Sequence, residues 1–144
     1  VYYRTGHHEA FAHLIEAGSD LYLMPSRYEP CGLNQMYSLR YGTPPVVRAV
    51  GGLADTVAEF DPVTREGTGF LFKDFHATDM LAALRHAIAI YRQPELMRAL
   101  QANGMGRDFS WRASADGYDR LYDEARERVA SGRLLNLTAV RAMI

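Results

Sequence analysis

The stretch that decides the fold reads LYLMPSRYEPCGLNQMYSLRYG over residues 21–42. It opens with four consecutive apolar residues, a pattern typical of a short strand buried on both faces of a parallel sheet. A polar loop follows over residues 25–32, and a helix is predicted from about residue 33 to residue 41, where Gly42 ends it. A buried strand, a loop and a helix in this order predict one βα unit of an α/β fold.

The same alternation continues on both sides of this unit. The patterns predict strands over residues 1–4, 21–24, 45–49 and 69–72. Helices are predicted over residues 8–16, 33–41, 53–60, 78–91, 94–104 and 111–131. Because the connections are short, we expect a four-stranded, mainly parallel sheet with helices on both faces.

Composition excludes several classes of protein. The chain has 144 residues, of which 48% are hydrophobic and 23% charged, the balance of a soluble globular protein. The formal net charge of −1 provides no basic field for a nucleic-acid partner. The apolar runs are too short to span a membrane. Cys31 has no second cysteine to pair with, which favours a reducing compartment, the cytoplasm, or a plastid in a plant.

Domain organisation follows from where the first predicted strand lies. The sequence begins at Val1, inside that strand, so we expect a piece of a longer protein. Residues 1–130 are predicted to form one domain that is incomplete at its N-terminus, and residues 131–144 a tail or helix extension.

The candidate site lies in the loops that follow the strands, because ligands of such sheets bind outside the carboxyl ends of the strands. The backbone N–H groups of residues 31–35, from Cys31 onward, lie at a helix start and suit a phosphate. Gly32 lets an anion approach the backbone closely. Glu29 precedes the helix and can reach a group attached to that phosphate. From spacing alone, an acidic residue and a turn with no ligand explain the pattern equally well.

Several motifs carry a resemblance. The run PSRYEPCGL at residues 25–33, followed by Gln35, resembles the signature of bacterial glycogen synthases and plant starch synthases. Further segments are similar to the same family in the same order. They are YGTPPVV at 41–47, GGLADTV at 51–57, GFLF at 69–72 and DFSW at 108–111.

The resemblance implies the GT-B architecture of two Rossmann-like domains, of which this chain is part of the C-terminal one. Family members transfer glucose from ADP-glucose to an α-1,4-glucan with retention of configuration, without a metal or other cofactor. It implies that Glu29 contacts the donor glucose and acts in catalysis, and that His7 lies against the adenine. It also implies that the amides of Gly32, Leu33 and Asn34 hold the distal phosphate. The resemblance further implies that cationic partners of the diphosphate, and a Lys-x-Gly-Gly loop, are supplied by an N-terminal domain, which we expect to precede this sequence.

The sequence departs from the family pattern at Asn34, where members carry Thr or Ile. His8 and His13 resemble part of a zinc motif, but five residues is about 500° of helix, so the two side chains diverge.

Two alternatives to an ADP-glucose enzyme stay open: a non-catalytic nucleotide- or glucan-binding module, and a related transferase that uses UDP-glucose or makes a sucrose product. Whether Glu29 is a nucleophile or orients the sugar is also open.

Overall fold

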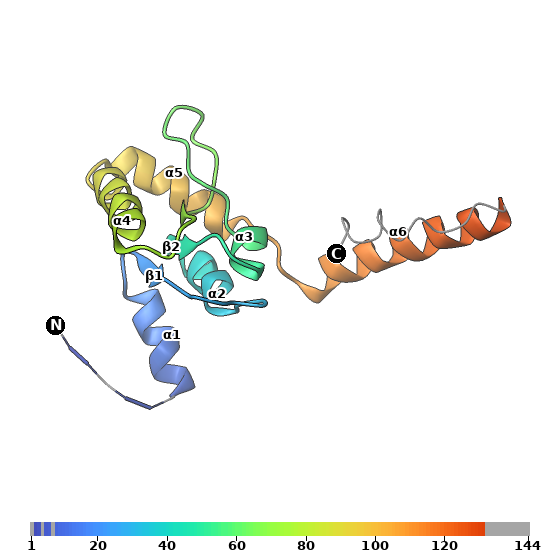
Figure 1. Cartoon of the computed structure of the whole chain (residues 1–144), viewed down its shortest axis with the longest axis horizontal. Coiled ribbons are helices and arrows are strands. Elements are labelled where there is room, and N and C mark those ends of the chain that lie inside the picture. The colour runs from blue at the N-terminus through green and yellow to red at the C-terminus, as the bar shows by residue number, and fades with distance from the viewer. Residues whose placement is uncertain (1, 4, 7, 132–144) are drawn as a thin grey trace. The chain divides into compact units, whose positions relative to one another are not determined.

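The computed structural model describes residues 2–3, 5–6 and 8–131. Its sheet is built from β1 (Tyr22–Met24), β2 (Pro45–Arg48) and β3 (Phe70–Phe72) in the order β1-β2-β3 (Figure 1). Both pairings are parallel, with Leu23 opposite Val46 and Val47 opposite Leu71. The predicted parallel α/β fold is therefore confirmed.

The prediction of a strand over residues 1–4 is wrong for the residues that the structure describes there. Tyr2 and Tyr3 belong to no helix or strand, and they are 80% and 83% exposed. Val1 and Arg4 lie outside the described residues. Aromatic content favours a strand only where a neighbouring strand offers hydrogen bonds, and these two tyrosines pair with none.

Five helices accompany the sheet within residues 8–107. Local signals set their ends: the His8 side chain accepts a hydrogen bond from Phe11 N–H at the first helix start, and Gly42 ends the second with φ of 74°. Pro94 occupies the first turn of the last of the five, as predicted. The helices are α1 (Glu9–Ala17), α2 (Asn34–Tyr41), α3 (Gly52–Thr56), α4 (Ala77–Tyr91) and α5 (Pro94–Met105).

α3 is shorter than the predicted helix over residues 53–60. Val57 leaves the helix with extended angles, φ −111° and ψ 125°. The backbone N–H of Ala58 then bonds the Thr68 hydroxyl at 3.0 Å, and that of Phe60 bonds the Gly69 carbonyl at 2.9 Å. These bonds to a distant segment replace the helical ones, and they carry Phe60 into the core, where it is 1% exposed.

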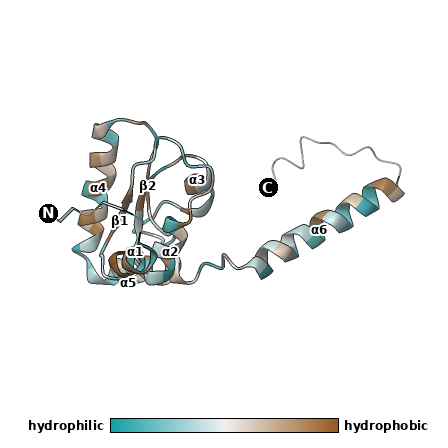
Figure 2. Cartoon of the chain, turned by 90° about the horizontal axis from the view of Figure 1, so that it is seen from below, coloured by the Kyte–Doolittle hydropathy of each residue, from teal (hydrophilic) through white to brown (hydrophobic). Residues whose placement is uncertain are grey.

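The core has one part on each face of the sheet. Val46 points to the face covered by α4 and α5, where it packs with Phe70 and Leu100. Val47, the next residue, points to the opposite face and packs with Leu53 of α3. Figure 2 shows hydrophobic colouring along β1 and β2, between α4 and α3. Burial on both faces explains the continuous apolar run of β2, whereas the predicted burial of β1 on both faces is wrong, because β1 lies at the edge of the sheet and Leu23 is 42% exposed.

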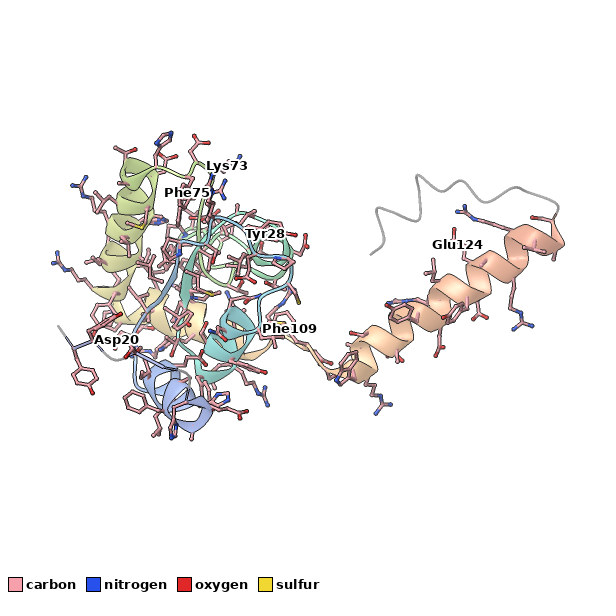
Figure 3. The ribbon with its side chains drawn as sticks, turned by 60° about the horizontal axis from the view of Figure 1, so that its bottom comes forward. Asp20, Tyr28, Lys73, Phe75, Phe109 and Glu124 are labelled. Atoms are coloured by element: carbon pink, nitrogen blue, oxygen red, sulfur yellow. The ribbon has the colours of Figure 1, made fainter. Side chains whose placement is uncertain are left out.

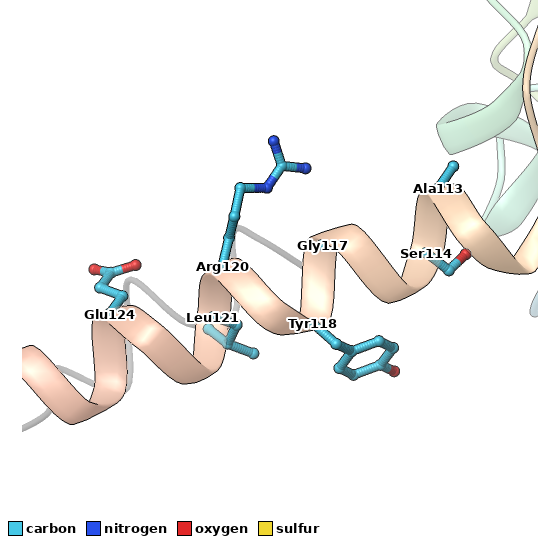
Figure 4. Close-up of a pocket in the computed structure, with 7 residues that line it drawn as sticks. All are labelled: Ala113, Ser114, Gly117, Tyr118, Arg120, Leu121 and Glu124. Atoms are coloured by element: carbon cyan, nitrogen blue, oxygen red, sulfur yellow. The ribbon is translucent and has the colours of Figure 1, made fainter.

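The described residues after Arg107, 108–131, belong to a second unit. Its helix α6 (Trp111–Ala130) begins where Ser110 accepts a hydrogen bond from Ala113 N–H, as predicted. The apolar spacing predicts an inward-facing side, yet no described residue of α6 is buried. Trp111 is 90% exposed and Val129 71%. A shallow hollow runs along the helix, and the described residues that line it are Ala113, Ser114, Gly117, Tyr118, Arg120, Leu121 and Glu124 (Figure 4).

Within residues 2–3, 5–6 and 8–131, no helix is both long enough and apolar enough to cross a membrane.

Candidate functional site

The carboxyl ends of the three strands meet at one edge of the sheet, because all three run parallel. The loop after β1, residues 25–33, joins the loops after β2 and β3 there. Figure 3 shows Tyr28, from the first loop, on the same side of the molecule as Lys73 and Phe75, which follow β3. Asp20, which precedes β1, lies at the other end. We call residues 25–33 the β1–α2 loop.

Glu29 is the carboxylate of the β1–α2 loop, and it is half-buried. The hydroxyl of Ser26 lies 3.5 Å from its Oε2 atom and can donate to it. Its backbone carbonyl accepts a hydrogen bond from Gly52 N–H at 3.2 Å. The main chain at Glu29 is therefore tied to the loop after β2, while the carboxylate keeps free acceptor capacity.

The turn at Gly51 and Gly52 packs directly on the β1–α2 loop. A Cβ atom on Gly51 would lie 2.0 Å from the carbonyl oxygen of Glu29, and one on Gly52 would lie 1.9 Å from that of Cys31. Gly51 also has a positive φ of 48°. Only glycine allows this close approach of the two backbones.

The start of α2 is open toward solvent. Leu33 occupies the N-cap position, and no side chain caps the helix. Gly32 precedes it with φ of 73°, and neither Gly32 N–H nor Leu33 N–H bonds any atom of the described chain. Unsatisfied N–H groups at a helix start carry partial positive charge and suit an anion. The N–H groups of Gly32 and Leu33 are therefore available to an anion, and the binding of a phosphate there stays a prediction.

The other predicted donor residues fare differently. The Asn34 side-chain amide nitrogen donates to the Tyr22 hydroxyl of β1 at 3.1 Å. Cys31 is an exposed free thiol at the loop. Leu33 is 53% exposed. His7, predicted to lie against the adenine, falls outside the described residues.

Arg48 is a site residue that the sequence patterns did not single out. Its Nε donates to the Lys73 carbonyl at 3.1 Å and its NH1 group to the Arg27 carbonyl at 2.8 Å. The guanidinium also lies over the Phe75 ring, 5.4 Å from the centroid. One side chain at the end of β2 thus joins the loops that follow β1 and β3. Its place as the last residue of the strand was the available signal.

Gln35 also has contacts in the site that the sequence patterns did not predict. It is fully buried beneath the β1–α2 loop. Its amide nitrogen contacts the carbonyl oxygens of Cys31 and Gly32 and the hydroxyl of Thr56. A glutamine inside the family signature was visible in the sequence, but its contact with Thr56 depends on how α2 and α3 pack.

Two carboxyl groups outside the β1–α2 loop have a raised pKa. Burial raises the pKa of Glu16, and nearby His13, at 3.9 Å, partly opposes that shift. Burial also raises the pKa of Glu59, against the hydrogen bond from Leu71 N–H and the charge of His86.

Ligand features elsewhere are sparse. The described residues hold no group of three His, Cys, Asp or Glu side chains that could bind a metal. A hollow lies at the amino-terminal end of β1, away from the loop edge. The described residues that line it are Gly18, Ser19, Asp20, Leu21, Ile88, Tyr91 and Arg92.

Comparison with known proteins places this edge in context. The family model described as "Glycosyl transferases group 1" matches residues 3–106. The chain belongs to this family of glycosyltransferases. It is 53% identical over 124 residues to a glycogen synthase of Koribacter versatilis (strain Ellin345), which covers 86% of the chain and 26% of the relative. It is 60% identical over 119 residues to a glycogen synthase of Anaeromyxobacter sp. (strain Fw109-5), covering 83% and 25%.

Solved structures agree with this assignment of the glycosyltransferase chain. The catalytic domain of starch synthase IV from Arabidopsis thaliana, bound to ADP and acarbose, matches with a TM-score of 0.73 and 38% identity, over 85% of this chain and 26% of that one. Sucrose-phosphate synthase from Thermosynechococcus elongatus matches with a TM-score of 0.59 and 31% identity, over 81% and 28%. The resemblance to the glycogen and starch synthase family, with its GT-B fold, is confirmed. The chain spans about a quarter of the length of these relatives.

Proposed function

We propose that this glycosyltransferase chain carries one half of a nucleotide-sugar site, with ADP-glucose as the donor and an α-1,4-glucan as the acceptor. The observation that carries the proposal is the open start of α2, which closely follows Glu29 in the β1–α2 loop at the carboxyl edge of the sheet. The relative of known structure with ADP and acarbose bound supports a nucleotide and a glucan as ligands.

The phosphate side of the site is the backbone from Cys31 to Asn34. The N–H groups of Gly32 and Leu33 are unpaired within the described chain, and the helix behind them adds its dipole. Fixed N–H dipoles stabilise the negative charge that develops on a leaving diphosphate without any reorganisation. His7 is proposed to contact the adenine.

The sugar side of the site is Glu29. A carboxylate beside the sugar orients it and favours the positive charge that develops near its anomeric carbon. In a retaining reaction it either attacks that carbon or stabilises the charge, and both roles require the ionised form. The Ser26 hydroxyl, 3.5 Å from Oε2, holds the carboxylate toward the loop.

The other partner is the rest of the enzyme. Amides at a helix start contribute only about 0.3–1 kcal/mol per exposed charge, whereas enzymatic rate enhancement needs about 8 kcal/mol or more. We therefore infer that a second domain supplies the cationic groups for the diphosphate and that the isolated chain transfers no glucose. From the single cysteine we also propose that the complete enzyme acts in the cytoplasm, or in a plastid in a plant.

Nucleotide titration tests the binding half of the proposal. The chain is titrated with ADP, UDP and AMP by isothermal calorimetry, with ¹H–¹⁵N spectra to locate the contact. We expect ADP to bind more tightly than UDP and to shift the amide signals of Gly32 and Leu33. Tighter binding of UDP would favour the alternative of a UDP-glucose enzyme, for which similarity to a sucrose-phosphate synthase is the supporting observation. Absence of any nucleotide binding would contradict the proposal.

A fusion tests the catalytic half. This chain replaces the matching segment of the Anaeromyxobacter sp. (strain Fw109-5) glycogen synthase, to which it is 60% identical. We expect the fusion, and not the chain alone, to incorporate glucose from ADP-glucose into glycogen. A folded fusion that binds ADP without turnover would favour the non-catalytic module instead, and turnover by the pure isolated chain would refute the inferred need for a second domain.

A further inference from the structure

Gln35 lies under the β1–α2 loop with its side chain 0% exposed. Its Nε2 atom is 2.9 Å from the Gly32 carbonyl oxygen, 3.2 Å from the Cys31 carbonyl oxygen and 3.0 Å from the Thr56 hydroxyl. An amide NH₂ group has two hydrogens, so these three acceptors share them. The contacts link the loop to α3, the helix that begins at Gly52 of the glycine turn.

The orientation of this amide is forced by its surroundings. Thr56 donates its own hydroxyl hydrogen to the Gly52 carbonyl at 2.6 Å, so toward Gln35 it can only accept. All three neighbours are then acceptors, and the NH₂ end must face them. The Oε1 end is left buried without a hydrogen-bond partner among the described residues. An unsatisfied buried acceptor destabilises a fold, so its presence suggests that the opposite end has a function that compensates.

The consequence appears in the peptide groups of the loop. In a trans peptide the carbonyl and the N–H of the next residue point in opposite directions, and the described chain has no cis peptide. The carbonyls of Cys31 and Gly32 are turned inward to Gln35. The N–H groups of the same two peptide units, those of Gly32 and Leu33, must therefore face outward.

We propose that Gln35 is a positioning residue for the diphosphate of the donor. By holding two carbonyls inward, it aims at the ligand the two N–H groups that are unpaired in the described chain. Thr56 fixes the amide from α3, so the packing of α2 against α3 sets the aim of the loop. This inference rests on the proposed nucleotide-sugar site, and it adds a residue that touches neither the nucleotide nor the sugar.

Conformational control by Gln35 predicts a specific change in selectivity. A second phosphate that is held by correctly aimed amides makes ADP bind more tightly than AMP. In Gln35→Met, which keeps the length of the side chain and removes its donors, the two peptide units are free to rotate. We expect the affinity for ADP to fall about tenfold or more, the loss of two hydrogen bonds, and the affinity for AMP to change less than about twofold.

The chain offers a matched control in Gln101. Gln101 lies in α5, away from the β1–α2 loop, and its side-chain amide also donates to a backbone carbonyl, that of Gly42, at 2.9 Å. Gln101→Met should lower the melting temperature as Gln35→Met does and leave the ratio of ADP to AMP affinity unchanged. A merely structural role for Gln35 predicts the same behaviour for both variants.

Thr56 supplies a second variant in case Gln35→Met does not fold. Thr56→Val removes the hydroxyl and Thr56→Ser keeps it. We expect the valine variant to lose part of the ADP preference and the serine variant to retain it.

The complete test measures ADP and AMP affinities by calorimetry, and melting temperatures, for the unmodified chain and these variants. A folded Gln35→Met or Thr56→Val protein with an unchanged ratio of ADP to AMP affinity would overturn the positioning role and leave the proposed nucleotide-sugar site standing. An unmodified chain that binds neither nucleotide would overturn the proposed site and, with it, this role.

Discussion

The backbone N–H of Gly52 donates a hydrogen bond to the carbonyl oxygen of Glu29 at 3.2 Å. The main chain of the candidate catalytic residue is therefore held by a glycine on the neighbouring loop, in a contact that joins the loops following two parallel strands. The backbones are so close that side chains are excluded at the turn.

Gly52→Ala should destabilise the fold and weaken nucleotide binding together. The added Cβ would lie 1.9 Å from the Cys31 carbonyl oxygen, so the β1–α2 loop must move. Overpacking of this kind costs about 1–3 kcal/mol, measurable by urea unfolding. Gly117→Ala is the control, because a Cβ there meets nothing within 4 Å in α6. A stable Gly52→Ala protein with normal ADP affinity would show that the close approach has no functional importance.

Arg48→Met should lower ADP affinity several-fold and stability by about 1 kcal/mol, the value of a typical hydrogen bond. The reason is the loss of the bonds to the Arg27 and Lys73 carbonyls, which join two loops of the site. Arg40→Met is a matched control, since Arg40 also donates to a backbone carbonyl, that of Met105 at 3.2 Å, away from the loop. Calorimetric titration and thermal melting of both variants check the prediction. An equal effect of the two substitutions on ADP affinity would contradict it.

Glu29→Gln in the active fusion should reduce kcat by about two to four orders of magnitude while ADP affinity changes little. The amide keeps the shape and hydrogen bonding of the side chain and removes the charge that stabilises the transition state. If the carboxylate only supports the start of α2, the loss appears instead as about 0.3–1 kcal/mol of stability. Steady-state kinetics and a melting curve separate the two. A kcat near that of the unmodified fusion would remove Glu29 from the catalytic mechanism.

The stability of the chain should carry a pH-dependent term from Glu16. Burial raises its pKa above the ordinary value of 4.5, so the native state keeps the proton at pH values where the unfolded chain has released it. The contribution is therefore full below the ordinary pKa and is lost as the pH rises through the native pKa. Glu16→Gln has no proton to lose. We expect it to be more stable than the unmodified chain at pH 7 and to show a smaller decline in stability from pH 4 upward.

Urea unfolding across this pH range measures the effect. Glu9→Gln, an exposed position of the same helix, is the control and should follow the unmodified chain. Parallel curves for the unmodified and Glu16→Gln proteins would show that the buried carboxyl group does not contribute the predicted term.

Local rules determined much of the fold from the sequence. The apolar runs at residues 21–24, 45–49 and 69–72 predicted β1, β2 and β3, and burial on both faces accounts for the continuous hydrophobic signal of β2. Caps and breakers predicted the starts of α5 and α6 and the end of α2 at Gly42, since these effects act within a few residues. The predicted strand over residues 1–4 failed at Tyr2 and Tyr3 because strand propensity needs a pairing partner.

The candidate site, too, could be predicted from sequence in part and depended on tertiary packing for the rest. The position of Glu29, Gly32 and the start of α2 in the loop after β1 could be predicted from sequence, because parallel strands place such loops at the carboxyl edge of the sheet, and their role in binding stays a prediction. Tertiary packing alone decided that Gln35 meets Thr56, 21 residues away, and that Arg48 reaches both Arg27 and Lys73. It also ended α3 at Thr56, through bonds from Ala58 and Phe60 to residues 68–69. These contacts join segments that are distant in the chain, and their distances depend on how whole helices and strands pack, which no pattern of neighbouring residues records.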